Sequence, residues 1–216
     1  MRHYPEFPNF FVVDHPLILH KLTQLRDVQC KSFGFRTMLR EISSLIGYEI
    51  SRELPLTTRR IRTPLMEMDA PTLATPDPCI VPVLRAGLGM AEGLVDLMPT
   101  AQVGHIGVYR DHETKKPVEY LVRLPKNIGQ DFFVVDPMLA TGNSLAHVCD
   151  VLLRHGIASE KIRVMALVAA PEGVRQFLSL HPTIRVYCAS LDERLNENAY
   201  IVPGLGDAGD RLYGTA

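Results

Sequence analysis

The sequence predicts an α/β protein in which a largely parallel sheet is covered by helices on both faces. Short apolar segments alternate along the chain with segments of helical periodicity, as where Cys79–Leu84 is followed by Gly87–Met98. Strands and helices that alternate at this length form βαβ units, and such units place their strands in parallel. The 216 residues are 46% apolar and can bury a substantial core, so we expect a single domain over residues 1–216.

The N-terminal region, about residues 1–52, is expected to be helical. Asp14 can cap a helix that has Pro16 in its first turn, and apolar residues recur at helical spacing over residues 17–28. A second helix with an apolar side is expected over residues 32–52.

An extended β-arm is expected over about residues 53–75, where Pro55 and Pro64 bracket a segment without helical periodicity. The arm carries a trio of arginines. A basic trio can contact nucleic acid, but a solvated strand face or a contact between copies of the chain is more common. The three residues are Arg59, Arg60 and Arg62.

The α/β core is expected over about residues 76–190. Strands are expected where short apolar runs lie between turn residues, and helices where the apolar spacing is helical. The expected strands are Cys79–Leu84, Gln102–Tyr109, Val118–Leu124, Phe132–Asp136, Ile162–Ala169 and Ile184–Ala189, and the expected helices are Gly87–Met98, Ser144–His155 and Pro171–Leu180.

Four polar or glycine-rich loops follow the expected strands. They lie around Arg85, around Arg110, at Asp136–Ser144 and after Ala189. Ligands of parallel sheets bind at the carboxyl ends of the strands, so these loops together predict the position of a binding site.

The run Asp136–Ser144, DPMLATGNS, combines a carboxylate, a turn of small residues and the start of a helix. The free N–H groups and the positive dipole end of a helix start favour an anion. Thr141 and Ser144 add hydroxyl groups, and Gly142 lets the backbone come close to a ligand. The run therefore predicts a phosphate site, with Asp136 placed to hold polyol hydroxyls or metal-bound water.

Two arginines follow other strands and can bind the oxygens of the same ligand. Arg85 lies in the run LRAGLGM, whose small residues would let the backbone wrap around a phosphate, although a structural turn with a solvated arginine is equally compatible with this run alone. Arg110 lies in the charged run Tyr109–Lys116, for which a solvated loop and a lid over an anionic ligand are alternatives.

Several classes of protein are excluded or disfavoured. Gly204–Gly209 matches G-x-G-x-x-G, but only seven residues follow it, too few for the helix and strand of a dinucleotide site. The P-loop pattern G-x-x-x-x-G-K-[ST] is absent, which excludes a P-loop kinase. The formal net charge of −1 gives no bulk attraction to nucleic acid or membrane, and no apolar run is long enough to span a bilayer. The four scattered cysteines favour buried thiols in a reducing cytoplasm.

What remains at Gly204–Gly209 is a glycine-rich loop with main-chain donors and acceptors around one carboxylate, Asp207. Such a loop suits the recognition of a flat heterocycle through main-chain hydrogen bonds.

Taken together, these motifs resemble the type I phosphoribosyltransferase family. The run DPMLATGNS is similar to that family's phosphoribosyl diphosphate motif, and its Pro137, where most of those enzymes have a second acidic residue, resembles the uracil phosphoribosyltransferase branch. The C-terminal run Tyr200–Asp210, YIVPGLGDAGD, and the RLYGT that follows resemble that branch's uracil-binding segment. With LRAGLGM and the N-terminal run DHPLILHKLT, the resemblance covers essentially the whole chain.

The resemblance implies a type I phosphoribosyltransferase-like fold, with N-terminal helices, a β-arm, a parallel core and a C-terminal base-binding segment over about residues 191–216. It implies a pyrimidine salvage enzyme that converts uracil and 5-phospho-α-D-ribose 1-diphosphate, here called phosphoribosyl diphosphate, to UMP and diphosphate. The implied catalytic residues are Arg85, Arg110, Asp136 and Asp207. The implied contacts to phosphoribosyl diphosphate are Arg85, Arg110, Asp136, Pro137, Met138, Leu139, Ala140, Thr141, Gly142, Asn143, Ser144 and Asp207, and those to uracil are Ile201, Gly206, Asp207 and Ala208.

The resemblance also implies partners. Mg²⁺ is expected to bind with phosphoribosyl diphosphate, GTP is a possible effector, and a homodimer or larger homo-oligomer is expected. Neither nucleic acid nor membrane is expected as a partner, and the expected location is the cytoplasm.

One position departs from the family pattern, because Asn143 stands where the commoner family sequence has glycine. Asn tolerates left-handed backbone better than other non-glycine residues, so we expect the phosphate turn to form. Affinity for the 5′-phosphate is the property that this residue puts in question.

Two alternatives to a uracil enzyme stay open at this point. One is a phosphoribosyltransferase for another nucleobase, such as a purine. The other is an RNA-binding pyrimidine regulator on the same fold, which should carry a basic face, and only the arginine trio of the β-arm hints at one.

Overall fold

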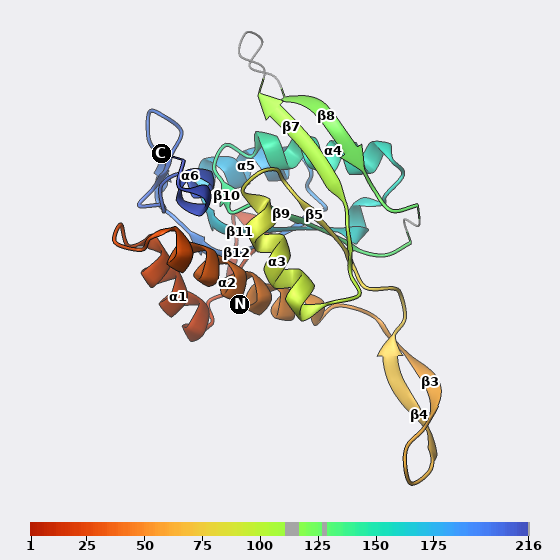
Figure 1. Cartoon of the computed structure of the whole chain (residues 1–216). Coiled ribbons are helices and arrows are strands. Elements are labelled where there is room, and N and C mark those ends of the chain that lie inside the picture. Colours follow the sequence, from red (N-terminus) through yellow and green to blue (C-terminus); the bar gives the residue numbers. More distant parts are fainter. Residues whose placement is uncertain (111–116, 127–128, 216) are drawn as a thin grey trace.

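The computed structural model of the chain describes residues 1–110, 117–126 and 129–215. An eight-stranded sheet lies at its centre (Figure 1). In chain order its strands are β1 (Arg2–Tyr4), β2 (Phe7–Val12), β5 (Cys79–Pro82), β6 (Gln102–Val103), β9 (Phe132–Val135), β10 (Met138–Leu139), β11 (Ile162–Ala169) and β12 (Arg185–Leu191). Their spatial order is β1-β2-β12-β11-β9-β5-β6, with β10 paired to β11. Strand β1 is antiparallel to β2 and the other pairs are parallel, so the predicted parallel sheet is confirmed.

Helices cover both faces of this sheet. Strand β9 shows why its sequence is continuously apolar, since Phe132 and Val134 face one core and Phe133 and Val135 face the other. All four side chains are fully buried, and truncation of Phe133 to Ala should cost about 3–5 kcal/mol of stability. One core packs against α4 (Asn143–Arg154) and α5 (Pro171–Leu180), and the other against α1 (Pro16–Arg26), α2 (Ser32–Ser51), α3 (Gly87–Leu97) and α6 (Ala208–Tyr213).

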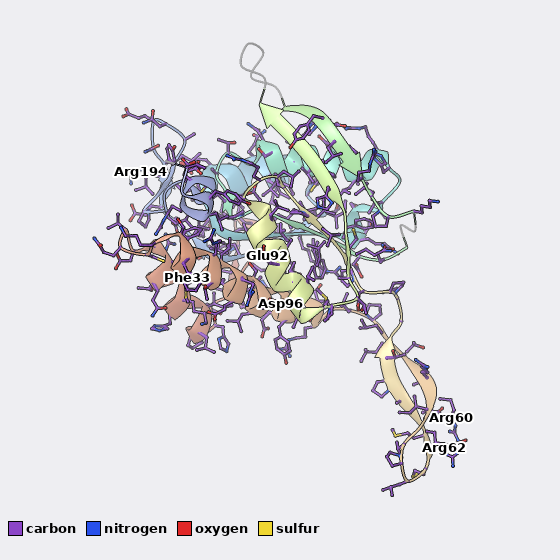
Figure 2. All side chains as sticks on the ribbon, in the orientation of Figure 1. Phe33, Arg60, Arg62, Glu92, Asp96 and Arg194 are labelled. Carbon is purple, nitrogen blue, oxygen red and sulfur yellow. The ribbon has the colours of Figure 1, made fainter. Side chains whose placement is uncertain are left out.

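Two hairpins extend from this body. The expected β-arm is formed by β3 (Leu56–Arg62) and β4 (Glu67–Leu73), which pair antiparallel and project away from the sheet (Figure 1). Every residue of β3 is exposed, and Figure 2 shows Arg60 and Arg62 on this arm. The second hairpin pairs β7 (His105–Arg110) with β8 (Pro117–Arg123). Smaller elements are η1 (Ser159–Lys161), β13 (Arg194–Leu195) and β14 (Ile201–Val202).

Three local predictions are wrong. The first twelve residues are not helical, because Phe7 and Phe10 are buried on β2, which extends the sheet beyond β12. Asp14 does not cap α1; the cap is His15, whose Nδ1 accepts a hydrogen bond from the Leu17 amide at 3.2 Å. The strand expected over 102–109 is divided at Gly104, so that β6 joins the central sheet and β7 joins the hairpin.

Cys30, Cys79, Cys149 and Cys188 are free thiols, and all but Cys30 are buried. Within the described ranges, none of the helices has the length and apolar character required to cross a membrane.

Candidate active site

The run Asp136–Ser144 connects β9 to α4 at the carboxyl edge of the sheet (Figure 1). Its first half is fixed to the neighbouring strand β11. The Pro137 carbonyl accepts hydrogen bonds from the amides of Leu167 at 3.0 Å and Val168 at 3.1 Å, and the Leu139 carbonyl accepts one from Ala170 at 3.0 Å. These bonds fix the first half of the run to the sheet. The second half, which leads into α4, therefore starts from a fixed position.

A hollow of about 70 Å³ lies on this run. Gly142 forms the N-cap of α4 with a left-handed φ of 81°, and no side chain of the described residues caps the helix start. Thr141 and Ser144 are exposed, so their hydroxyls are open to a ligand. The hollow thus offers uncapped helix amides and hydroxyls, the groups that bind a phosphate. Its lining residues are Asp136, Met138, Leu139, Ala140, Thr141, Gly142, Ser144 and Leu145.

Asn143 does not need the left-handed backbone that we considered for it. It is the first residue of α4, and the left-handed conformation belongs to Gly142. A Cβ on Gly142 would lie 2.7 Å from the Gly173 carbonyl oxygen, so this position needs glycine on two counts. Asn143 is exposed and is not among the residues that line the hollow.

Asp136 is half-buried beside the hollow. Burial raises the pKa of its carboxyl from 3.8 to about 7, a backbone hydrogen bond from Met138 opposes this rise, and the negative charge of Asp207 adds to it. The charge of Asp207 makes the smallest of these contributions, and it indicates that the C-terminal loop lies near Asp136 although the two residues are far apart in the sequence. The arrangement favours ligands that supply hydroxyl donors or a cation.

Arg85 lies between β5 and α3, after a cis Leu84–Arg85 peptide bond. The nearby glycines serve packing. A Cβ on Gly87 would overlap the Val135 carbonyl oxygen, so glycine lets α3 begin directly against the end of β9. A Cβ on Gly89 would lie 3.1 Å from Leu212 of α6. The small residues of this run therefore bring α3 close to β9 and α6, a role that we did not predict.

Tyr213 joins the C-terminal segment to the Arg85 loop. Its hydroxyl donates a hydrogen bond to the Arg85 carbonyl oxygen at 3.0 Å, and the Arg85 guanidinium carbon lies 5.7 Å from the centre of its ring. Sequence reasoning assigned no role to Tyr213, although the RLYGT run that contains it contributed to the resemblance. The two residues are 128 positions apart, so no local pattern could have paired them.

The expected base-binding residues lie around the start of α6. Ile201 is buried on β14, Gly206 is exposed with φ of 77°, and Ala208 is the first residue of α6. Asp207 caps α6 by accepting a hydrogen bond from the Asp210 amide at 3.0 Å. The loop thus presents main-chain groups beside a carboxylate that also affects Asp136.

Arg110 cannot be placed in the site. Its backbone ends β7 and pairs with Pro117, but its side chain lies outside the described residues. The rest of the charged run, residues 111–116, also lies outside them.

A metal ion would depend on its ligand for most of its coordination. Among residues 1–110, 117–126 and 129–215, no group of three or more His, Cys, Asp or Glu side chains could hold one. Asp136 and Asp207 supply two carboxylates that bear on the same region. This donor set fits Mg²⁺, which commonly binds one or two carboxylates, substrate phosphates and water.

Comparisons with known proteins agree along the whole chain. A profile of the family described as uracil phosphoribosyltransferase matches residues 12–215. A uracil phosphoribosyltransferase of Rhodospirillum centenum is 63% identical over 215 residues, covering 100% of both chains. One of Paraburkholderia phymatum is 59% identical over 209 residues, covering 97% of this chain and 96% of the relative. A solved structure of a protein from Aquifex aeolicus has a TM-score of 0.89 at 34% identity, covering 96% of this chain and 99% of that one.

Proposed function

The chain belongs to the uracil phosphoribosyltransferase family and converts uracil and phosphoribosyl diphosphate to UMP and diphosphate, and we propose that the reaction takes place between Asp136–Ser144 and the C-terminal loop. The observation that carries this proposal is that Asp207, at the start of α6, lies near enough to Asp136 for its charge to contribute to the raised pKa of that carboxyl. It links the phosphate hollow to the loop around the start of α6.

The hollow on the run Asp136–Ser144 suits the 5′-phosphate of the sugar donor. Main-chain amides at the start of α4 and the hydroxyls of Thr141 and Ser144 would hold its oxygens. Asp136, at the end of β9, would accept hydrogen bonds from the ribose hydroxyls, and Asp207 would reach the sugar-diphosphate from the opposite side.

The leaving diphosphate needs cationic partners, and we assign this role to Arg85 and Arg110. Arg85 is exposed at the carboxyl edge, and Tyr213 holds its carbonyl oxygen. Arginine binds phosphate oxygens through a fork of donors, which fixes orientation as well as charge. Mg²⁺ bound with the substrate would lie near Asp136 and Asp207 and would supply neutralisation of charge on the diphosphate.

Uracil is assigned to the loop that contains Gly206, Asp207 and Ala208, with Ile201 beside it. Main-chain N–H groups that face the O4 position would donate hydrogen bonds to this uracil carbonyl oxygen, and they would meet a second donor in the amino group of cytosine. Two donors facing one another cost about 1–3 kcal/mol, enough to discriminate between the two bases.

The reaction requires positioning more than covalent participation of the protein. Uracil N1 would displace diphosphate from C1′ of the ribose with inversion, through a transition state with oxocarbenium character. The tasks of the chain are to align N1 with C1′, to stabilise the charge that develops on the diphosphate and to exclude water. We assign no residue as a general base.

An acceptor competition assay tests this function. The protein is mixed with Mg²⁺, phosphoribosyl diphosphate and radiolabelled uracil, in the presence of excess unlabelled uracil, cytosine or hypoxanthine. We expect labelled UMP to form and only unlabelled uracil to suppress it. Formation of IMP from hypoxanthine instead of UMP would assign the chain to another nucleobase.

An RNA-binding regulator is not supported by the arginine trio of the β-arm. Arg60 pairs with Glu67 at 3.3 Å and with Asp69 at 3.4 Å on the adjacent strand, which compensates part of the positive charge. We expect filter binding to detect no RNA at moderate salt. Retention of RNA with a steep salt dependence would favour the regulator.

We also propose that the chain forms a homodimer or larger assembly through the β-arm. The arm exposes apolar side chains at its tip, where Leu65 is 94% exposed and Met66 65% exposed. Isolated apolar residues are common on protein surfaces, but these two lie on a projecting hairpin, so a second copy can cover them without rearrangement of the core.

Two further proposals rest on the resemblance and on composition. GTP is proposed as an effector, and initial rates with and without GTP test it, since equal rates at all substrate concentrations would exclude activation.

A cytoplasmic location is proposed because the thiols are free, as expected in a reducing compartment. Cell fractionation tests this location.

A further inference from the structure

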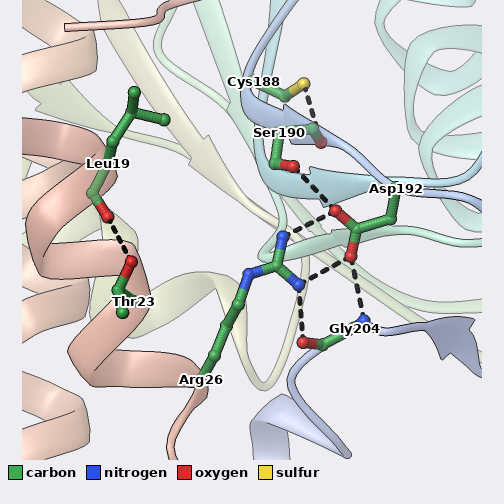
Figure 3. Close-up of polar contacts among 7 residues, drawn as sticks. All are labelled: Leu19, Thr23, Arg26, Cys188, Ser190, Asp192 and Gly204. Carbon is green, nitrogen blue, oxygen red and sulfur yellow. Dashed lines mark hydrogen bonds and ion pairs between the residues drawn. The ribbon is translucent and has the colours of Figure 1, made fainter. Parts of the chain in front are cut away.

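Asp192, one residue after the end of β12, has a carboxylate in which each oxygen accepts two hydrogen bonds (Figure 3). Oδ1 accepts from Arg26 Nη2 at 2.6 Å and from the Ser190 hydroxyl at 2.7 Å. Oδ2 accepts from Arg26 Nη1 at 2.7 Å and from the Gly204 amide at 2.9 Å. The Asp192 side chain is only 2% exposed, so the pair with Arg26 is bidentate and largely shielded from water.

Gly204 is held at both of its main-chain polar groups by this pair (Figure 3). Its amide donates to Asp192, and its carbonyl accepts from Arg26 Nη1 at 2.6 Å. Gly204 has a left-handed φ of 63°, and a Cβ there would overlap the Ile201 carbonyl oxygen. The start of the glycine-rich loop is therefore fixed in one conformation.

Arg211 fixes the next residue of the loop. Its Nη1 donates to the Leu205 carbonyl at 2.9 Å, and its Nη2 donates to the carbonyls of Asp27 at 2.7 Å and Cys30 at 3.1 Å. The next residue, Gly206, is exposed. Arg26 and Arg211 thus hold Gly204 and Leu205, and the main chain becomes accessible to a ligand at the residue that follows.

Electrostatics agree with a pair that stays ionised. Burial raises the pKa of the Asp192 carboxyl, but hydrogen bonds from Arg26 and Ser190 outweigh burial and hold the pKa below its usual value of 3.8. A protonated Asp192 would carry a hydrogen on one oxygen and could not accept all four hydrogen bonds, so the observed geometry requires the ionised carboxylate.

We propose that Arg26 and Asp192 are positioning residues for the nucleobase, which orient the main chain of Gly206–Ala208 without touching the base. This inference rests on the proposed assignment of uracil to that loop. A rigid main chain discriminates between uracil and cytosine only while its N–H groups keep their direction. The pair should therefore control the affinity and the selectivity for the base and leave the sugar-donor site at Asp136–Ser144 unaffected.

Two variants test the proposal in steady-state kinetics. Asp192→Asn removes the charge and one acceptor oxygen, and Arg26→Lys keeps the charge but cannot bridge both Asp192 oxygens and the Gly204 carbonyl. In both we expect KM for uracil to rise about tenfold and the preference for uracil over cytosine to fall, while KM for phosphoribosyl diphosphate rises much less, because Asp207 is the one residue of the loop assigned to that substrate. Lys21→Gln is the matched control, because it removes a 2.6 Å ion pair with Glu41 from the same helix, away from the loop.

The outcomes separate the proposal from a general structural role. Equal increases in KM for both substrates, or wild-type kinetics in both variants, would overturn it. If either variant fails to fold by circular dichroism, Ser190→Ala removes one hydrogen bond and keeps both charges; a smaller rise confined to KM for uracil supports the proposal, and unchanged kinetics overturns it. If the wild-type protein forms no UMP, the proposed function fails, whereas wild-type activity with unaffected variants rejects this inference alone.

Discussion

Asp136 is held in an environment that makes it titrate near neutral pH. Burial, then the charge of Asp207, raises the pKa of its carboxyl to about 7 from 3.8. The folded chain thus binds this proton more tightly than the unfolded chain. The stabilising contribution of protonated Asp136 is full below pH 3.8 and is lost as the pH rises through about 7.

We therefore expect Asp136→Asn to lose less free energy of unfolding than the wild type between pH values of about 5 and about 8. Urea unfolding at the two pH values measures the difference, with Glu197→Gln, an exposed carboxylate, as control. If the free energy of unfolding changes by the same amount with pH in Asp136→Asn and in the wild type, the pKa of Asp136 is not raised in the folded chain.

The phosphate turn places its conformational demand on Gly142 and not on Asn143. We expect Asn143→Gly to change KM for phosphoribosyl diphosphate by less than about threefold, because Asn143 already has helical backbone. Gly142→Ala should raise the same KM at least about tenfold, since its Cβ would press on Gly173 and its φ is left-handed. A larger change in KM for Asn143→Gly than for Gly142→Ala would show that the turn depends on Asn143 and not on Gly142.

Candidate site residues could be proposed from the sequence where they stand in local patterns, but not where their partners are distant. Asp136, Gly142 and Asp207 stand in recognisable runs. Arg26 lies on α1 with its partners 166 and 178 positions away, so only the fold brings it to the C-terminal loop. The contact of Tyr213 with Arg85 could not be predicted for the same reason, because the two residues are 128 positions apart.

At the scale of elements, the sequence predicted the α/β alternation because each buried strand is a continuous apolar run. It missed β2, a strand of six residues that buries Phe7, Phe10 and Val12 but contains Pro8 and Asn9, which are uncommon in strands. It also missed the break at Gly104, which depends on where β6 leaves the central sheet and β7 joins a hairpin.

The contact between α6 and the Arg85 loop gives a prediction at this scale. Tyr213→Phe keeps the ring beside Arg85 and removes the hydrogen bond to its carbonyl, which is worth about 0.5–1.5 kcal/mol. We expect KM for phosphoribosyl diphosphate to rise about threefold to tenfold in Tyr213→Phe. Steady-state kinetics measures this, with Tyr48→Phe, an exposed tyrosine of α2, as control. Wild-type values in Tyr213→Phe would mean that the hydroxyl does not support the diphosphate site.

For the whole molecule, the shape of the β-arm predicts self-association. Its tip exposes Leu65 and Met66, and Figure 1 shows the arm extending far from the sheet. We expect the wild type to sediment as a dimer or larger species and the double variant Leu65→Ser, Met66→Ser to shift towards monomer. Arg62→Ser on the same arm is the control. A wild type that is monomeric, or a double variant with unchanged mass, would contradict this role.

In the proposed function, one site holds the phosphate at Asp136–Ser144 and the base at Gly206–Ala208. The most direct test is a crystal structure of the protein with UMP bound. We expect the 5′-phosphate oxygens to lie about 2.7–3.2 Å from main-chain nitrogens at the start of α4, and the uracil ring to lie against the main chain of Gly206–Ala208. A phosphate outside the hollow at Asp136–Ser144, or a base that does not contact the C-terminal loop, would contradict the account.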